Sequence, residues 1–194
     1  MIIAWFSCGV TSAVACKIAL SLYENVQLYY IETGSGHPDN TRFLADCEKW
    51  YNQPIHIIRS DKYSCVSDVL RKGYINGAHG AACTLELKKK VRYKLEKELG
   101  SWDGQVWGFD YDPKEINRAI RLKQQYPNTK PVFPLIEKQI TKPDAMRICN
   151  NCRFAKNISH DQIGTLASYA RKFQKCLESC RDVVIILFMK DSHT

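Results

Sequence analysis

The stretch Ile2-Ile3-Ala4-Trp5-Phe6-Ser7-Cys8-Gly9-Val10-Thr11-Ser12 decides the fold of this chain. An apolar run gives way to small and hydroxyl-bearing residues, and residues 13–20 then follow a helical pattern. The sequence therefore predicts a strand, a tight loop and a helix N-terminus. Such a loop directs backbone N–H groups at one point, where the helix dipole favours an anion. An ordinary turn after a buried strand has the same outline, so the rest of the chain has to distinguish the two.

Length and composition indicate one globular domain with a core of its own. The chain has 194 residues, of which 45% are hydrophobic and 25% charged, and these values are ordinary for a soluble protein. No apolar run reaches the roughly 18 residues that a membrane span needs. No basic segment precedes Ile2, as it would in a signal peptide. We therefore expect a cytoplasmic protein with no membrane contact.

The charge of the chain favours partners that carry phosphate. The formal net charge is +8, which suits nucleotides and nucleic acid. The densest basic run, residues 88–94, also has the pattern of a solvated helix face. A small-molecule nucleotide is the expected partner, nucleic acid is the alternative, and a homo-oligomer is compatible with the sequence.

Apolar strands alternate with helical segments along the first three quarters of the chain. This alternation predicts an α/β fold: a doubly wound, mostly parallel, Rossmann-like sheet with helices on both faces. Ligands of such sheets bind beyond the C-terminal ends of the strands. Residues 131–135 are too rich in proline for a central strand. The expected strands are 2–6, 26–31, 54–58 and 105–109, and the expected helices are 11–23, 40–51, 66–72, 85–99, 113–126 and 141–148.

The loop after the first strand is the predicted phosphate site. Ser7, Thr11 and Ser12 offer hydroxyl groups, and Gly9 allows a ligand to approach the backbone closely. The predicted site comprises Ser7, Cys8, Gly9, Val10, Thr11 and Ser12.

Three further segments follow predicted strands or open predicted helices. Glu32-Thr33-Gly34 ends the second strand, where backbone could pass close to an adenine or ribose, although a flexible turn would look the same. Cys83-Thr84-Leu85-Glu86-Leu87-Lys88 opens the strongest helix, where Thr84 could also be a plain N-cap. The segment from Gly108 to Arg118 follows the fourth strand. Its Arg118 could bind phosphate or pair with Glu115 on the same helix face.

In this order the four segments resemble the phosphoadenosine phosphosulfate (PAPS) reductase family, within the PP-loop or adenine nucleotide α-hydrolase-like superfamily. The resemblance covers about residues 1–148, which we expect to form the nucleotide-binding domain. It implies that the cleft binds an adenine nucleotide (PAPS, 3′,5′-bisphosphoadenosine or ATP) and that Thr84 and Lys88 line it. Two departures stand in the loop, where Cys8 replaces a glycine and Thr11 an aspartate. The family's C-terminal Glu-Cys-Gly-x-His motif is missing from this sequence.

The cysteines after residue 148 form a pattern of their own. Residues 149–194 are predicted to be a helical extension, with a helix over 166–180 and a strand or helix end over 183–189. Thiolates at C-x2-C and C-x3-C spacing suit zinc or an iron–sulfur cluster, but buried or unreactive cysteines have the same spacing. The candidate ligands are Cys149, Cys152, Cys176 and Cys180, and the candidate catalytic thiols are Cys83 and Cys152.

Three functions are compatible with these observations. The leading hypothesis is an oxidoreductase of sulfur metabolism, similar to PAPS reductases, that handles a phosphosulfate or phosphate-bearing adenine nucleotide. The second is an ATP-dependent transferase that inserts sulfur into nucleic acid, for which the absence of an aspartate at Thr11 is unfavourable. The third is a non-catalytic protein that binds a nucleotide or a partner on the same fold.

Overall fold

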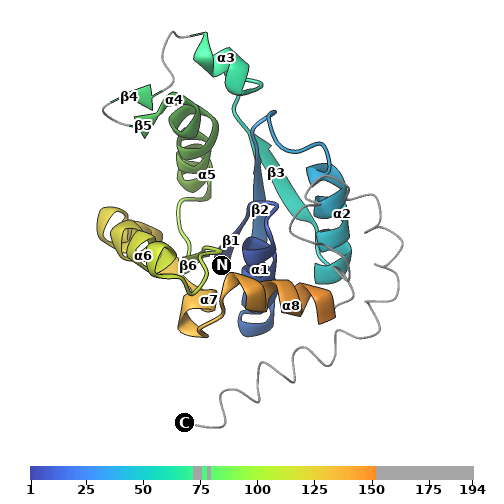
Figure 1. The fold of residues 1–194 in the computed structure, drawn as a ribbon. Coiled ribbons are helices and arrows are strands. Elements are labelled where there is room, and N and C mark those ends of the chain that lie inside the picture. Colours follow the sequence, from blue (N-terminus) through green and yellow to red (C-terminus); the bar gives the residue numbers. More distant parts are fainter. Residues whose placement is uncertain (72–75, 78–79, 152–194) are drawn as a thin grey trace.

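A five-stranded parallel sheet forms the centre of the computed structural model, which describes residues 1–71, 76–77 and 80–151 (Figure 1). The strand order is β3-β2-β1-β6-β7, and each neighbouring pair is parallel. The strands are β1 Ile2–Phe6, β2 Val26–Glu32, β3 Ile55–Arg59, β6 Gly104–Val106 and β7 Pro131–Val132. A short antiparallel pair, β4 Asn76–Gly77 and β5 Gly80–Ala81, lies apart from this sheet.

Helices of different lengths connect the strands. A continuous helical run crosses from α4 into α5 through a π-helical turn, η1, and a 3₁₀ turn, η2, precedes β7. The helical segments are α1 Val10–Leu22, α2 Asn40–Tyr51, α3 Val66–Leu70, α4 Ala82–Thr84, η1 Leu85–Lys89, α5 Lys90–Leu99, α6 Pro113–Gln125, η2 Pro127–Thr129, α7 Pro134–Glu137 and α8 Lys142–Asn151.

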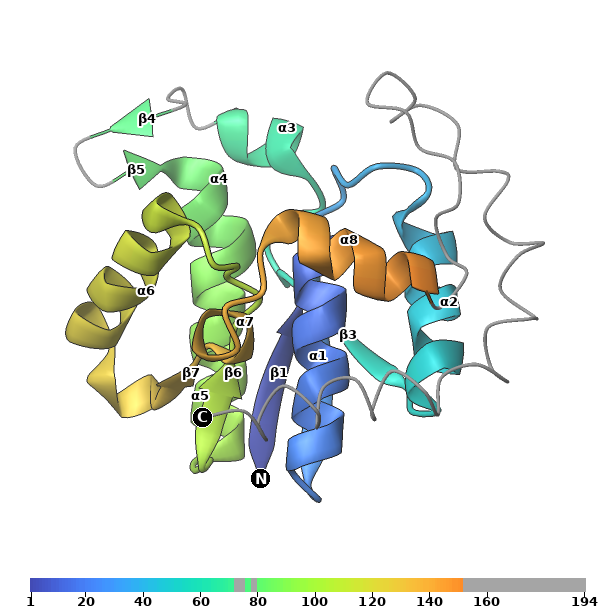
Figure 2. The ribbon, with the colours of Figure 1, turned by 60° about the horizontal axis from the view of Figure 1, so that its bottom comes forward.

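Strand β1 is buried on both faces, because it lies between two layers of helices. Its residues Ile2, Ala4 and Phe6 belong to one core cluster with residues of α1, α2 and α8. Ile3 and Trp5 point to the opposite face and pack with residues of α5. Figure 2 shows α1 and α8 in front of the sheet and α5 behind it. The predicted α/β fold, with a parallel sheet and helices on both faces, is therefore confirmed.

The order in which the chain adds strands to the sheet reverses at β1. Strands β2 and β3 extend to one side of β1, whereas β6 and β7 extend to the other. The connections on the two sides diverge at the C-terminal ends of β1 and β6, which opens a crevice there. This is the edge at which the sequence predicts ligand binding.

Side chains cap the N-termini of two helices, α6 and α8. The Asp112 side chain accepts a hydrogen bond from the Lys114 N–H, and Pro113 occupies the first turn of α6. At α8 the Asp144 N–H donates to Thr141 Oγ1 at 3.3 Å, and the Thr141 N–H donates to the Asp144 carboxylate at 3.1 Å. This reciprocal pair is a capping box with Thr141 as the N-cap, and it starts the helix that the sequence predicts over 141–148.

The predicted fourth strand, residues 105–109, was too long. The strand ends at Val106, and the next residue, Trp107, still donates its N–H to Val132 O at 3.0 Å. Its partner β7 has only two residues and begins with a proline, so little backbone is available to extend the ladder. The position of β7 at the sheet edge agrees with the expectation that 131–135 is no central strand.

The proposed boundary after residue 148 falls inside α8, which continues to Asn151. Cys149 is buried in the core cluster that contains β1 and α1. The segments 166–180 and 183–189 lie outside the described residues, as do Cys152, Cys176 and Cys180. Of the helices that the structure describes, none combines the length and the hydrophobicity needed to cross a bilayer.

Candidate functional site

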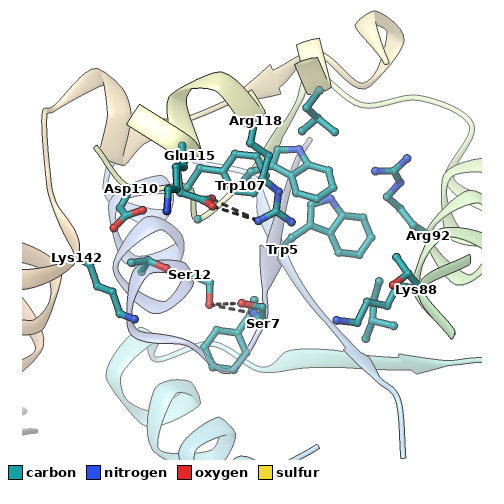
Figure 3. A pocket seen from close by; sticks show the side chains of 18 of the residues that line it. Trp5, Ser7, Ser12, Lys88, Arg92, Trp107, Asp110, Glu115, Arg118 and Lys142 are labelled. Carbon is teal, nitrogen blue, oxygen red and sulfur yellow. Dashed lines mark hydrogen bonds and ion pairs between the residues drawn. The ribbon is translucent and has the colours of Figure 1, made fainter. Parts of the chain in front are cut away.

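A large cleft opens at the C-terminal ends of β1, β2 and β6, at the point where the sheet reverses its strand order. Its volume is about 1310 Å³. The end of β1, the β1–α1 loop and the segment after β6 form its floor, and residues of η1, α5, α6 and α8 form its walls (Figure 3). Of the predicted phosphate and nucleotide ligands, the cleft is lined by Ser7, Thr11, Ser12, Thr33, Thr84, Lys88, Gly108 and Arg118.

The hydroxyl group of Ser12 holds the β1–α1 loop together. Ser12 Oγ accepts hydrogen bonds from the N–H groups of Ser7 at 3.0 Å and Gly9 at 3.3 Å, and it donates to Gly9 O at 2.8 Å. Ser7 Oγ lies 3.0 Å from the same atom. Ser12 is buried, whereas Ser7 is exposed at the cleft. The Ser12 hydroxyl therefore shapes the loop, and Ser7 and Thr11 present their side chains to the cleft.

Close packing requires a glycine at position 108. A Cβ atom there would lie 2.4 Å from Ser12 Cα and 2.7 Å from Ser12 N, far inside van der Waals contact with backbone. At Gly9 a Cβ would meet only Ser7 Oγ at 3.7 Å and Ser12 Oγ at 4.0 Å. Contacts within the protein therefore demand the glycine at Gly108, whereas Gly9 leaves open space beside the two hydroxyl groups.

Cationic side chains from three elements surround this loop. Lys88 comes from η1, Arg118 from α6 and Lys142 from α8, and Figure 3 shows the Lys88 and Arg118 side chains directed toward Ser7 and Ser12. The cleft as a whole has more basic than acidic residues. The basic ones are Lys88, Lys89, Arg92, Lys114, Arg118, Arg121 and Lys142, and the acidic ones are Asp110, Asp112 and Glu115.

Of the two roles that the sequence allowed for Arg118, the structure shows the pairing with Glu115. Nη1 of Arg118 lies 3.4 Å from Glu115 Oε1, and the guanidinium carbon lies 4.6 Å from the centre of the Phe109 ring. The side chain remains 61% exposed, so the ion pair is weak. The guanidinium thus remains accessible to a ligand in the cleft.

The residues of the turn after β2 fall into two groups. Some form the turn itself, and others line the cleft. Glu32 accepts a hydrogen bond from the Gly34 N–H at 2.7 Å. Gly34 has φ +64°, and a Cβ atom there would collide with Ser64 O at 1.7 Å. Thr33, Ser35 and Gly36 face the cleft. Thr33 therefore lines the cleft, while Glu32 and Gly34 form the turn that holds it.

Neither the loop residue Cys8 nor the candidate catalytic thiol Cys83 is part of the cleft lining. The Cys8 residue has φ +55°, and its Sγ lies 3.8 Å from Asn40 O. Burial raises the pKa of the Cys8 thiol to about 12, against a hydrogen bond from Tyr30 that lowers it. Cys83 packs against a small cluster of Val69, Ala82 and Leu87.

A metal site gains no support from the described part of the chain. Cys149 is buried among apolar residues. Within residues 1–71, 76–77 and 80–151, no group of three or more His, Cys, Asp or Glu side chains could hold a metal ion. The proposed ligands Cys152, Cys176 and Cys180 lie outside these residues, so the four-cysteine site stays a prediction.

An aromatic wall with a buried arginine was missed in the sequence. Trp5, Trp107, Phe109 and Tyr126 line the cleft together with Arg92. The spacing of Lys88 and Arg92 by four residues places both on one helix face. From this spacing Arg92 could have been predicted to line the cleft beside Lys88. The aromatic residues gave no such signal in the sequence, because an aromatic residue at the end of a buried strand usually belongs to the core.

Comparisons with known proteins identify a similar fold but no family. No family model matches the sequence, and no curated protein matches it. Among solved structures, the chain is similar to a phosphoadenylyl-sulfate (PAPS) reductase from Candida auris in a phosphate complex, with 15% identity and a TM-score of 0.52. The match covers 70% of this chain and 65% of the reductase, less than two thirds of its length. At this identity the similarity establishes a shared PAPS reductase-like α/β fold.

Proposed function

We propose that this protein binds an adenine nucleotide in the cleft, with the phosphate or phosphosulfate end at the β1–α1 loop. One observation carries the proposal: Lys88, Arg118 and Lys142, from three separate elements, line a single cleft with the N-terminus of α1. Three cations around one helix N-terminus form a strong anion site.

The first turn of α1 supports an anion in a second way. An α-helix leaves its first N–H groups without acceptors in the helix, and here these belong to Val10, Thr11 and Ser12. The first turn contains no acidic residue that would compete for them. The half-buried Thr11 adds a hydroxyl donor at the same place, whereas the Ser7 hydroxyl donates to Ser12 Oγ.

The nucleoside would extend from this loop along the end of β2. Ile31, Thr33, Ser35 and Gly36 line that part of the cleft, and Gly36 exposes backbone. This arrangement suits a ribose and an adenine, which need polar contacts at their edges and close approach to their faces. The fold neighbour is a phosphoadenylyl-sulfate reductase in a phosphate complex, which agrees with a phosphate-bearing ligand for this cleft.

Chemistry on the bound nucleotide is the less supported part of the proposal. Cys8 lies in the loop, but its raised pKa leaves it protonated and a poor nucleophile near neutral pH. Cys83 and Cys152 remain the candidate thiols for a PAPS reductase-like reaction. ATP-dependent transfer and binding without turnover are the alternatives, and nucleotide turnover distinguishes the three.

The test is calorimetric titration with ATP, adenylyl sulfate, phosphoadenylyl sulfate and 3′,5′-bisphosphoadenosine. We expect Gly9→Val to abolish binding, because the added methyl groups would fill the space beside Ser7 Oγ and Ser12 Oγ. We expect Lys88→Ala and Arg118→Ala each to lose about 1.5–3 kcal/mol, or roughly tenfold to a hundredfold in affinity.

The control is Lys123→Ala, which removes an exposed cation from the same helix as Arg118 but outside the cleft lining. Its affinity should equal that of the unmodified protein. Equal losses in the Lys123 and Arg118 variants would indicate a nonspecific charge effect and refute the site. Sulfite release from phosphoadenylyl sulfate favours the reductase, pyrophosphate release from ATP favours the transferase, and binding alone favours the non-catalytic function.

A further inference from the structure

Two buried residues of the cleft carry side-chain N–H groups that have no hydrogen-bond acceptor in the described part of the chain. The atoms are Nε and Nη2 of Arg92 and Nε1 of Trp107, and of these Arg92 Nε forms an ion pair with Glu96. The Arg92 side chain is only 8% exposed, and both residues line the cleft. Buried polar groups without partners are rare in folded proteins. Two of them side by side indicate a place where a ligand supplies the acceptor.

Aromatic rings hold the Arg92 guanidinium in position. Its central carbon lies 4.9 Å from the Tyr93 ring centre, 5.4 Å from that of Trp107 and 5.0 Å from that of Tyr126. The hydroxyl groups of the two tyrosines lie 3.3 Å apart and connect α5 to the end of α6. The guanidinium is thus fixed by stacking before any ligand binds.

An ion pair, continued by two hydrogen bonds, fixes the other side of Arg92. Its Nε lies 3.3 Å from Glu96 Oε1, and the same oxygen accepts a hydrogen bond from Gln105 Nε2 at 2.8 Å. Gln105 Oε1 in turn accepts from Trp5 Nε1 at 2.9 Å. The carboxylate therefore engages the Nε edge of the guanidinium, and Nη2 is left for another acceptor.

This place is separate from the β1–α1 loop. Tyr126 follows the last residue of α6, and Arg118 lies eight residues earlier, a distance of ~12 Å along a helix axis. The rings of Trp107 and Phe109, 6.1 Å apart, lie between the two guanidinium groups, with Arg92 over Trp107 and Arg118 over Phe109. One phosphate at the loop could not reach both arginines.

We propose that Arg92 and Trp107 form a second oxyanion-binding subsite, between α5 and α6, that accepts a phosphate or carboxylate group. A charged acceptor is favoured over a neutral one because the donor is a guanidinium and Lys89 lines the same wall. The acidic residues of the cleft, Asp110, Asp112 and Glu115, lie at the opposite end of α6. This inference goes beyond the nucleotide proposal and does not depend on it.

The test is a titration followed by NMR of the indole N–H signals in ¹⁵N-labelled protein, with inorganic phosphate in one arm and acetate in the other. Chloride keeps the ionic strength constant. We expect the Trp107 indole signal to shift saturably with at least one anion, and Arg92→Met to weaken that response about tenfold or more. If Arg92→Met does not fold, Arg92→Lys is measured instead. Trp107→Phe assigns the signal.

Two controls make the result specific. The Trp102 indole donates to Thr129 O at 3.2 Å and lies outside the cleft lining, so its signal should not move. In Gly9→Val, which removes the loop site, the response of Trp107 to phosphate should persist, and this separates the subsite from the nucleotide proposal. A Trp107 signal that ignores both anions, or that loses its response in Gly9→Val, would overturn the subsite.

Discussion

At the scale of single residues, the site depends on which atoms are already engaged within the protein. The sequence predicts Ser12 as a hydroxyl donor to an anion. A hydroxyl group has one proton to donate, and Ser12 gives it to Gly9 O. In the same way, the sequence points to Gly9, whereas the steric demand falls on Gly108. Neither could be predicted, because both follow from contacts between segments that fold together only in three dimensions.

We expect Gly108→Ala to destabilise the protein by about 1–3 kcal/mol, the usual cost of overpacking. The new Cβ would meet Ser12 Cα at 2.4 Å, and backbone cannot move aside as a side chain can. Gly9→Ala is the matched control, with no Cβ contact closer than 3.7 Å. Urea unfolding of both variants measures the difference. Equal free energies of unfolding would show that the segment after β6 does not press on the loop.

At the scale of elements, local sequence patterns predicted the features that depend on neighbouring residues alone. The apolar run of β1, together with Pro113 and Thr141, was sufficient to place the strand and the starts of two helices. The end of β6 was not predictable, because it depends on the short edge strand β7. The π-helical turn at Leu85–Lys89 was also missed. Such turns often occur at functional sites, and this one contributes Lys88 and Lys89 to the cleft.

The connection between the sheet and helix α5 depends on Gln105, which is fully buried. We expect Gln105→Leu to lower the free energy of unfolding by about 1–3 kcal/mol, because the Trp5 indole and the Glu96 carboxylate would each lose a partner. Gln27→Leu on β2 is the control, since Gln27 is only half-buried and its amide accepts from the Tyr29 hydroxyl alone among the contacts described. Chemical denaturation compares the two. A loss no larger than that of Gln27→Leu would mean that the network contributes no stability.

At the scale of the whole molecule, the topology was predictable and the walls of the cleft were not. Alternating strands and helices predict a ligand at the C-terminal strand ends, and the loop residues Ser7, Thr11 and Ser12 lie there. Lys142 reaches the same place because α8 packs against α1, a long-range contact with no local signal. Arg92 lies in the cleft wall where Arg92 and Tyr93 of α5 contact Tyr126, the residue after α6. The sequence therefore predicts the floor of the site, and tertiary packing decides its charge.

The core predicts how the whole protein responds to alkaline pH. Cys16, Cys47 and Tyr51 lie in the cluster that joins α1, α2 and β1. Burial raises the pKa of each above its ordinary value. These groups therefore keep their protons in the folded state at a pH where the unfolded chain releases them. By linkage, the free energy of unfolding is unaffected at neutral pH and falls as the pH rises above 9.0, the ordinary pKa of a thiol.

We expect each fully buried thiol to contribute a slope of up to ~1.4 kcal/mol per pH unit in that range. Urea unfolding on either side of pH 9.0 measures the slope. Cys16→Ala removes one such group, so its stability should fall less steeply with pH than that of the unmodified protein, whatever its stability at neutral pH. Burial also raises the pKa of Cys8, to about 12, so Cys8→Ala should reduce the slope as well. If Cys16→Ala and the unmodified protein lose stability in parallel above pH 9.0, then the Cys16 thiol ionises as readily in the folded state as in the unfolded one, and the packing of α1 against the sheet is looser than the structure indicates.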